Sequence, residues 1–122
     1  MPRLTIRIDF DGQGSFGPGK ARLLELIDAK GSIRRAAAAM EMSYRQAWLL
    51  LRDAEAAIGA PLIVTASGGA KGGGTKLSAA GRDVVACYRR IEQVAARAAG
   101  ADLRALEGAA DSTARRPASQ KN

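Results

Sequence analysis

The 122-residue chain contains no histidine, one cysteine and few aromatic side chains. Histidine is the commonest neutral metal ligand and general base, so its absence disfavours metal sites and catalytic triads. The lone cysteine, Cys87, has no second cysteine with which to form an internal disulfide. We therefore expect a protein that is not an enzyme and that has no catalytic residues, no metal site and no cofactor.

The sequence also lacks a long apolar run. No stretch reaches the roughly 20 apolar residues that a membrane helix needs. The first ten residues alternate instead of forming the apolar block of a signal peptide. We therefore expect a cytoplasmic protein without a membrane partner. Its hydrophobic content of 47% is enough for one domain to fold without disulfides.

Basic residues outnumber acidic ones, with 19 Lys and Arg against 12 Asp and Glu and a net charge of +7. Such a balance favours polyanionic partners. The excess is concentrated in residues 34–82, and this placement indicates a nucleic acid more strongly than the total charge does. In that region Arg34, Arg35, Arg45, Arg52, Lys71, Lys76 and Arg82 stand against Glu41, Asp53 and Glu55.

The stretch Ser32–Gly59 predicts two short helices joined by a tight turn. Ser32 and Ser43 can each cap a helix, because a serine hydroxyl accepts a hydrogen bond from an unpaired amide in the first turn. Met40–Met42 leave room only for a turn. The alanines at Ala36–Ala39 allow the first helix to cross closely over the second, because their side chains are small. The pattern is that of a helix-turn-helix.

The second of these helices has two contrasting faces. A buried stripe is expected at the three-and-four spacing of Ala47, Leu50, Leu51, Ala54 and Ile58. The opposite face is basic and aromatic, and it carries Arg45, Trp48, Leu49 and Arg52.

The segments around the helix pair predict a strand, a helix, a hairpin and a long helix. Leu4–Phe10 alternates between apolar and polar residues, as a strand with one buried face does. A glycine-rich loop at Asp11–Gly19 leads into a helix that has Pro18 in its first turn, runs to Lys30 and is stopped by Gly31. Residues 62–65 and 75–77 form a hairpin around a glycine-rich tip, and Ser78 caps the long helix.

The long helix carries an apolar stripe near heptad spacing, which runs over about two heptads and is too short to establish a coiled coil. The stripe either packs between two subunits or covers the chain's own domain. It consists of Val84, Cys87, Tyr88, Ile91, Val94, Ala95 and Ala98. We expect one domain over residues 1–108 and a disordered basic tail over residues 109–122.

This order of elements is that of a winged helix-turn-helix, a mainly α fold with a small β wing, here with an amino-terminal strand and a long carboxy-terminal helix. The chain also resembles the DNA-binding domain of the molybdate-responsive ModE regulators, which is itself similar to the LysR-type amino-terminal domain. The resemblance covers most of Leu4–Ile91. It is carried by Gly31-Ser32, Ala36-Ala37, SYRQAW at 43–48, Gly59-Ala60-Pro61-Leu62, the wing sequence GGAKGGG and LSAAG at 77–81.

The resemblance implies a transcriptional regulator that binds double-stranded DNA sequence-selectively as a homodimer. The helix from Ser43 would enter the major groove, and the wing at Gly68–Gly74 would lie against the backbone or the minor groove. Full-length ModE regulators also carry a carboxy-terminal oxyanion-binding region, for which this sequence shows no matching segment. We therefore expect no direct molybdate sensing by this chain, and regulation by another small molecule stays open.

A helix in the major groove reads bases with residues near its amino terminus. Arg45 is the best candidate, because a guanidinium pairs bidentately with guanine, although a solvated surface arginine is the alternative. Trp48 either contacts a sugar or thymine methyl group, or packs under the wing or the first strand. The expected base readers are Ser43, Tyr44, Arg45 and Trp48, and the expected phosphate contacts are Arg34, Arg35, Arg52, Lys71 and Lys76.

Two functions of other classes compete with DNA binding. Gly14–Ala21 matches most of a phosphate-binding loop, but Ala21 stands where a serine or threonine would hold magnesium. No repeated strand-helix pattern follows to build the parallel sheet of a nucleotide-binding enzyme. The second alternative is a protein-protein interaction module, in which the apolar Trp48 and Leu49 help to dock an acidic partner.

Overall fold

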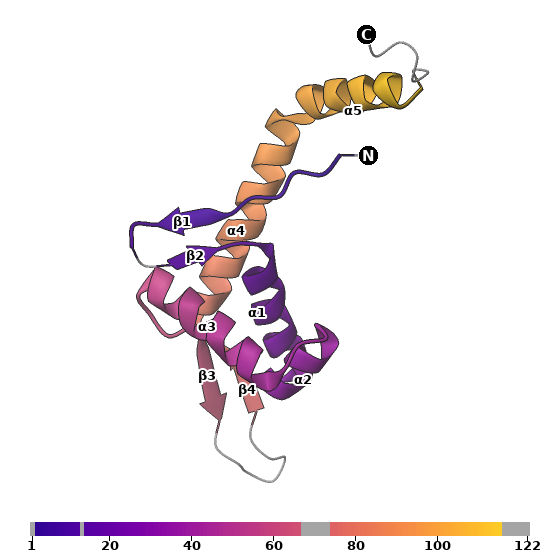
Figure 1. The fold of residues 1–122 in the computed structure, drawn as a ribbon. Coiled ribbons are helices and arrows are strands. Elements are labelled where there is room, and N and C mark those ends of the chain that lie inside the picture. The colour runs from indigo at the N-terminus through magenta and orange to yellow at the C-terminus, as the bar shows by residue number, and fades with distance from the viewer. Residues whose placement is uncertain (1, 13, 67–73, 116–122) are drawn as a thin grey trace.

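The computed structural model describes residues 2–12, 14–66 and 74–115 (Figure 1). These residues form five helices and two small antiparallel sheets, which confirms the predicted mainly α, winged helix-turn-helix fold. In chain order the elements are β1 (Ile8–Phe10), β2 (Gly14–Phe16), α1 (Pro18–Lys30), α2 (Ile33–Ala39), α3 (Tyr44–Ile58), β3 (Ile63–Ala66), β4 (Gly74–Leu77), α4 (Ala79–Ala98) and α5 (Gly100–Arg115).

The helix-turn-helix consists of α2 and α3, and both predicted caps are confirmed. The Ser32 hydroxyl accepts a hydrogen bond from the Arg35 amide at 3.1 Å and begins α2. At the start of α3, the Gln46 amide donates to Ser43 Oγ at 3.0 Å, and the Ser43 amide donates back to Gln46 Oε1 at 3.4 Å. This reciprocal capping box satisfies two otherwise unpaired amides. Glu41, with a positive φ of 56°, reverses the chain between the helices.

The core lies where α1, α2 and α3 meet. Ala36 and Ala37 of α2 are buried, so α2 packs closely against its neighbours, as the alanine run predicts. The prediction that α3 buries Leu50 and Ile58 is wrong, because both are only partly buried at the edge of the core. The buried residues of α3 are Ala47, Leu51, Ala54 and Ala57, so the predicted stripe is confirmed at three positions and also includes Ala57.

The amino-terminal strand is shorter than predicted and belongs to a hairpin that the sequence analysis missed. Strand β1 covers only the last three residues of Leu4–Phe10. It pairs with β2, inside the predicted loop, with Ile8 opposite Phe16. The pairing of the two strands cannot extend further, because helix α1 begins at Pro18, directly after Gly17. The preceding segment is held instead by a side chain of α4, since Tyr88 Oη donates to the backbone carbonyl of residue 6 at 2.7 Å.

The hairpin that the sequence predicts is confirmed. It is the second hairpin along the chain, and we call β3, β4 and their connection the wing. Its register places Ile63 opposite Leu77. Hydrogen bonds tie β4 to the end of α1, so the base of the wing has a fixed place beside the helix-turn-helix. The Thr75 amide donates to Gly31 O at 2.9 Å, the Leu77 amide to Asp28 Oδ1 at 3.0 Å and the Lys76 ammonium to Asp28 O at 2.9 Å. The tip at residues 67–73 lies outside the described residues.

Helix α4 divides the predicted apolar stripe between two environments. Its cap is the predicted Ser78. Tyr88 is buried and Val84 packs against the core, whereas Ile91 and Val94 are 38% and 56% exposed. The first half of the stripe therefore covers the chain's own domain, and the second half is open to a partner.

The chain stays helical beyond the predicted end of the domain. The sequence predicts disorder from residue 109, but this prediction is wrong as far as Arg115, where α5 ends. Alanine has the highest helix propensity, and alanines at positions 105, 109, 110 and 114 favour the helix over a disordered tail. Residues 116–122 lie outside the described part. Figure 1 shows α5 turning away from the end of α4 and from the remaining helices.

An arginine on α4 fastens this helix to α1. Arg89 donates through Nε and Nη2 to both carboxylate oxygens of Glu25, at 3.0 and 2.8 Å, and through Nη1 to Glu92 at 2.7 Å. The hydrogen bonds from Arg89 lower the pKa of Glu25 below its usual value. The carboxylates in turn raise the pKa of Arg89. The bidentate geometry makes this ion pair stronger and more directional than an ordinary surface pair.

We expect Glu25→Gln to lower the free energy of unfolding by about 1 to 2 kcal/mol at neutral pH, because an amide cannot accept the charged fork in the same way. The folded-state pKa of Glu25 is depressed, so its contribution is present above the unfolded pKa and is lost as the pH falls through the folded pKa. Urea titrations between neutral pH and about pH 3 should show the deficit shrinking in acid.

The matched control is Glu41→Gln, at an exposed position outside the network. It should change the stability by less than about 0.5 kcal/mol, as most exposed substitutions do. If the stability difference between Glu25→Gln and the parent stays constant with pH, packing and not the charge of Glu25 holds α1 against α4.

Candidate nucleic-acid interface

The amino-terminal part of α3 presents an exposed ridge beside the wing. Arg45, Leu49 and Arg52 follow one another at spacings of four and three residues, so they lie along one side of the helix. All of them are exposed, and Leu49 is 58% exposed. Arg45 has no hydrogen bond, ion pair or ring contact within the described part of the chain. Its guanidinium is therefore available to an external ligand.

Next to Arg45 and Leu49, four side chains form a row that we call the aromatic ladder, with two aromatic rings in the middle and a guanidinium at each end. The Arg34 guanidinium lies 4.4 Å from the centre of the Tyr44 ring. The Tyr44 and Trp48 rings meet edge to face with their centres 6.2 Å apart. Arg52 follows at 5.6 Å from the centre of the Trp48 ring. Each cation contributes about 0.5 to 1 kcal/mol at an exposed site, so the ladder favours one orientation of both rings.

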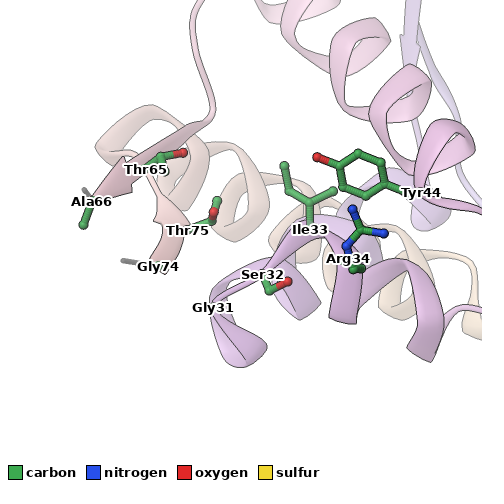
Figure 2. A pocket seen from close by; sticks show the side chains of 9 residues that line it. All are labelled: Gly31, Ser32, Ile33, Arg34, Tyr44, Thr65, Ala66, Gly74 and Thr75. Atoms are coloured by element: carbon green, nitrogen blue, oxygen red, sulfur yellow. The ribbon is translucent and has the colours of Figure 1, made fainter. Parts of the chain in front are cut away.

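A cleft of about 350 Å³ separates the aromatic ladder from the wing. Figure 2 shows the amino ends of α2 and α3 on one side of this cleft and the strands β3 and β4 on the other, with the Tyr44 hydroxyl directed toward Thr65. Arg34 and Thr75 also line it. Hydroxyls and a guanidinium on opposite walls suit phosphate oxygens, which accept hydrogen bonds from both.

The predicted base readers differ in how much of each side chain is exposed and not already bonded within the protein. The Ser43 hydroxyl already accepts the Gln46 amide, so it serves first as the helix cap. Trp48, which helix geometry places on the outward face, is partly buried against the core, so part of its ring has the packing role that the sequence left open. Tyr44 is 40% exposed, and Arg45 is exposed without a partner among the described residues.

The predicted phosphate contacts do not all lie together. Arg34 and Arg52 belong to the aromatic ladder, at its two ends. Arg35 lies beside Lys30 in a different cleft, which α1 and α2 form. The Lys76 ammonium holds β4 against the end of α1, a role that the sequence did not indicate. Lys71 lies outside the described residues.

The sequence analysis missed a contact that fixes α3 against the amino-terminal hairpin. Lys20 forms an ion pair with Asp53 of α3 and also donates to the Ser15 carbonyl at 2.6 Å. The hydrogen bond from Lys20 holds the pKa of Asp53 below its usual value. The only signal in the sequence is an acidic residue within a basic region, because the two partners lie 33 positions apart.

This contact bears on the rival nucleotide-binding interpretation. The lysine of the phosphate-loop pattern in Gly14–Ala21 is Lys20, and its ammonium is bound within the protein. The first residues of the pattern form strand β2 of an antiparallel hairpin instead of a loop around a phosphate. The local geometry therefore disfavours nucleotide binding at this segment.

The part of the chain that the structure describes contains no group of three or more histidine, cysteine, aspartate or glutamate residues that could hold a metal ion. None of its helices is both long and apolar enough to pass through a membrane. Cys87 is exposed and not in a disulfide. Cations, hydroxyls and aromatic rings make up the candidate interface, and these groups suit a polyanion that carries stacked bases.

Known proteins similar to this chain have names that refer to molybdenum. The chain is 40% identical over 85 residues to the molybdenum transport protein ModE of Azotobacter vinelandii, a match that covers 70% of this chain and 32% of that protein. It is 41% identical over 71 residues to ModE of Herbaspirillum seropedicae, covering 58% and 26%. It is 37% identical over 76 residues to the molybdenum-pterin-binding protein MopB of Rhodobacter capsulatus, covering 62% and 28%. No protein-family model matches the chain.

The chain thus spans about a third or less of the length of these relatives. The matches support the relationship to the ModE family that the sequence motifs indicate. What the relatives transport or bind, according to their names, belongs to those longer proteins.

Proposed function

We propose that this chain is the sequence-selective DNA-binding part of a molybdate-related transcriptional regulator. The observation that carries the proposal is the exposed ridge of α3, on which Arg45 has no partner among the described residues. Arg45 directly follows Tyr44, which lines the cleft between the aromatic ladder and the wing. The similarity to proteins named ModE supports the same interpretation.

In this proposal, the amino end of α3 enters the major groove, which admits one α-helix. Arg45 is the second residue of α3, where residues of a recognition helix meet base edges. The wing then lies against the backbone or the minor groove. Ser43, Tyr44, Arg45 and Trp48 face bases or sugars, and Arg34, Arg35, Arg52, Lys71 and Lys76 contact phosphates.

The proposal includes a homodimer that forms through α4. Ile91 and Val94 stay exposed on the part of α4 that extends beyond the core, and Leu106 of α5 is also exposed. Pairing of two copies along this helix would remove these side chains from water, which is favourable. A dimer of this kind binds two half-sites about one helical turn of DNA apart.

The test is selection from a random pool of double-stranded DNA by the full chain. We expect one family of sequences with paired half-sites to be enriched. If a dimer contacts about six phosphates, the affinity for the selected DNA should fall with salt at a log-log slope near −5, since each contact contributes roughly −0.9. A pool without an enriched sequence contradicts selective binding, and a flat salt titration contradicts the phosphate contacts.

A matched pair of arginine variants tests which charges take part. Arg35→Ala should make the salt slope shallower by about 0.9 for each phosphate contact that is lost. Arg22→Ala removes an exposed arginine on α1, outside the proposed DNA contacts and the dimer helix, and should leave the slope unchanged. Equal effects of both substitutions would indicate that net charge alone sets the affinity.

A protein-protein interaction module is the second candidate, because Leu49 is an apolar side chain exposed on the ridge. In this case the basic ridge docks an acidic protein surface. The same random pool separates the two functions, since a module of this kind enriches no DNA sequence.

A further inference from the structure

Few hydrogen-bonding side chains are free to read bases at the amino end of α3. Direct readout relies mostly on arginine, lysine, asparagine and glutamine. Residues 44–50 contain only Arg45 and Gln46 of these types. Gln46 accepts the Ser43 amide through its side chain and donates its own amide to Ser43. Arg45 is therefore the single unengaged reader of this kind in that segment.

The same two turns expose apolar surface instead. Leu49 is 58% exposed and Tyr44 is 40% exposed, with Trp48 partly exposed next to them. In the major groove, the apolar group that distinguishes one base from the others is the 5-methyl group of thymine. An exposed leucine on a helix in that groove has this methyl group as its natural partner.

The aromatic ladder makes this surface rigid before any ligand arrives. Arg34 comes from α2 and Arg52 from the third turn of α3, and they stack on the two ends of the Tyr44–Trp48 pair. Side chains that are already ordered lose less conformational entropy when they bind. Because the rings are already ordered, more of the favourable free energy of an apolar contact with a base remains to discriminate one base from another.

We infer that two side chains of α3, the exposed Leu49 and Tyr44 of the aromatic ladder, read the 5-methyl groups of thymine in each half-site. Leu49 lies one helical turn beyond Arg45, a rise of about 6 Å, which is close to two base-pair steps. The methyl group read by Leu49 thus lies about two base pairs from the base read by Arg45. This inference rests on the proposed DNA binding and names the base chemistry that the same surface recognises.

The test replaces single thymines of the selected DNA with deoxyuridine, which lacks the methyl group and keeps every hydrogen-bonding group. At a thymine that Leu49 or Tyr44 contacts, binding should weaken about fourfold, the factor expected when one buried methyl group is removed. Thymines outside the contact should show no change. If no deoxyuridine weakens binding while the DNA sequence still matters, the inference is wrong and the proposed function stands. If no sequence is enriched at all, both fail.

Variants of the exposed side chains assign the contact. Leu49→Ala should abolish the deoxyuridine effect at its own position, whereas Tyr44→Phe keeps the ring and should keep the effect. Leu4→Ala is the matched control, because Leu4 is 38% exposed in the amino-terminal segment, outside both α3 and the proposed dimer surface, and its loss should leave the deoxyuridine effect unchanged. If Leu49→Ala and Tyr44→Ala both retain the full effect, other residues or DNA shape read the methyl group, and the assignment is overturned.

Discussion

Gly81→Ala should lower the free energy of unfolding by about 3 kcal/mol or more, the sum of forced backbone movement and a weakened hydrogen bond. A Cβ atom at Gly81 would lie 2.1 Å from the Leu62 carbonyl oxygen and 3.1 Å from its carbon. Both are backbone atoms and cannot rotate away. The same carbonyl accepts the Ser78 amide at 2.9 Å, so moving it disturbs the start of α4.

The control for this substitution is Gly19→Ala. Gly19 is the second residue of α1, and a Cβ atom there would meet nothing within 4 Å. Because alanine restricts the unfolded chain and favours helix, this variant should be more stable by about 0.5 kcal/mol. Urea denaturation of the two variants and the parent measures both effects. A Gly81→Ala variant as stable as the parent would show that α4 can separate from the wing without loss.

Arg45→Ala should weaken binding to the preferred DNA by about 1 to 3 kcal/mol for each half-site and relax the selectivity at one base position, if Arg45 pairs bidentately with guanine. The exposed side chain of Arg45 makes no hydrogen bond, ion pair or ring contact among the described residues, so folding should be unaffected. Arg35→Ala is the matched comparison, an exposed arginine on α2. It should weaken all DNA sequences alike, because phosphate contacts carry no sequence information.

Binding to a series of single-base variants of the selected DNA measures both substitutions. Arg45→Ala should level the differences at one position of each half-site and preserve them elsewhere. A uniform loss from Arg45→Ala together with a position-specific loss from Arg35→Ala would reverse the two roles. If Arg45→Ala does not change the selectivity, Arg45 does not read a base.

The elements that could be predicted from sequence are those with local signals. Ser32, Ser43 and Ser78 each cap a helix by binding an amide three residues further on, so a short stretch of sequence contains the whole interaction. The stop of α1 at Gly31 is equally local, because its φ of 71° favours glycine. The order of elements then followed from these boundaries.

The features that could not be predicted depend on residues far apart in the chain. Lys20 meets Asp53 across 33 positions, and Lys76 meets the Asp28 carbonyl across 48. The first hairpin was missed because its second strand, Gly14–Phe16, has only three residues and lies within a glycine-rich segment. Neither its composition nor its periodicity distinguishes it from a loop.

The sequence predicted which residues belong to the candidate site better than it predicted how their side chains are arranged. The spacing on α3 placed Arg45 and Arg52 on the exposed side, and the structure agrees. Arg34 was assigned to a phosphate from its charge alone. Its position over the Tyr44 ring depends on the angle at which α2 crosses α3. The sequence pattern of neither helix predicts this angle. This stacking changes Arg34 from an independent cation into part of a surface shared by two helices.

The hydrogen bonds between β4 and the end of α1 have a consequence for the DNA sequence that we propose the chain to bind. Asp28 and Gly31 hold the base of the wing, and the same turn of chain leads directly into α2. The base of the wing and the start of the helix-turn-helix are therefore anchored to the same end of α1. One inserted base pair displaces the backbone by about 3.4 Å. In the proposed complex, the bases contacted by α3 and the sugars contacted near the wing therefore keep a constant spacing within each half-site.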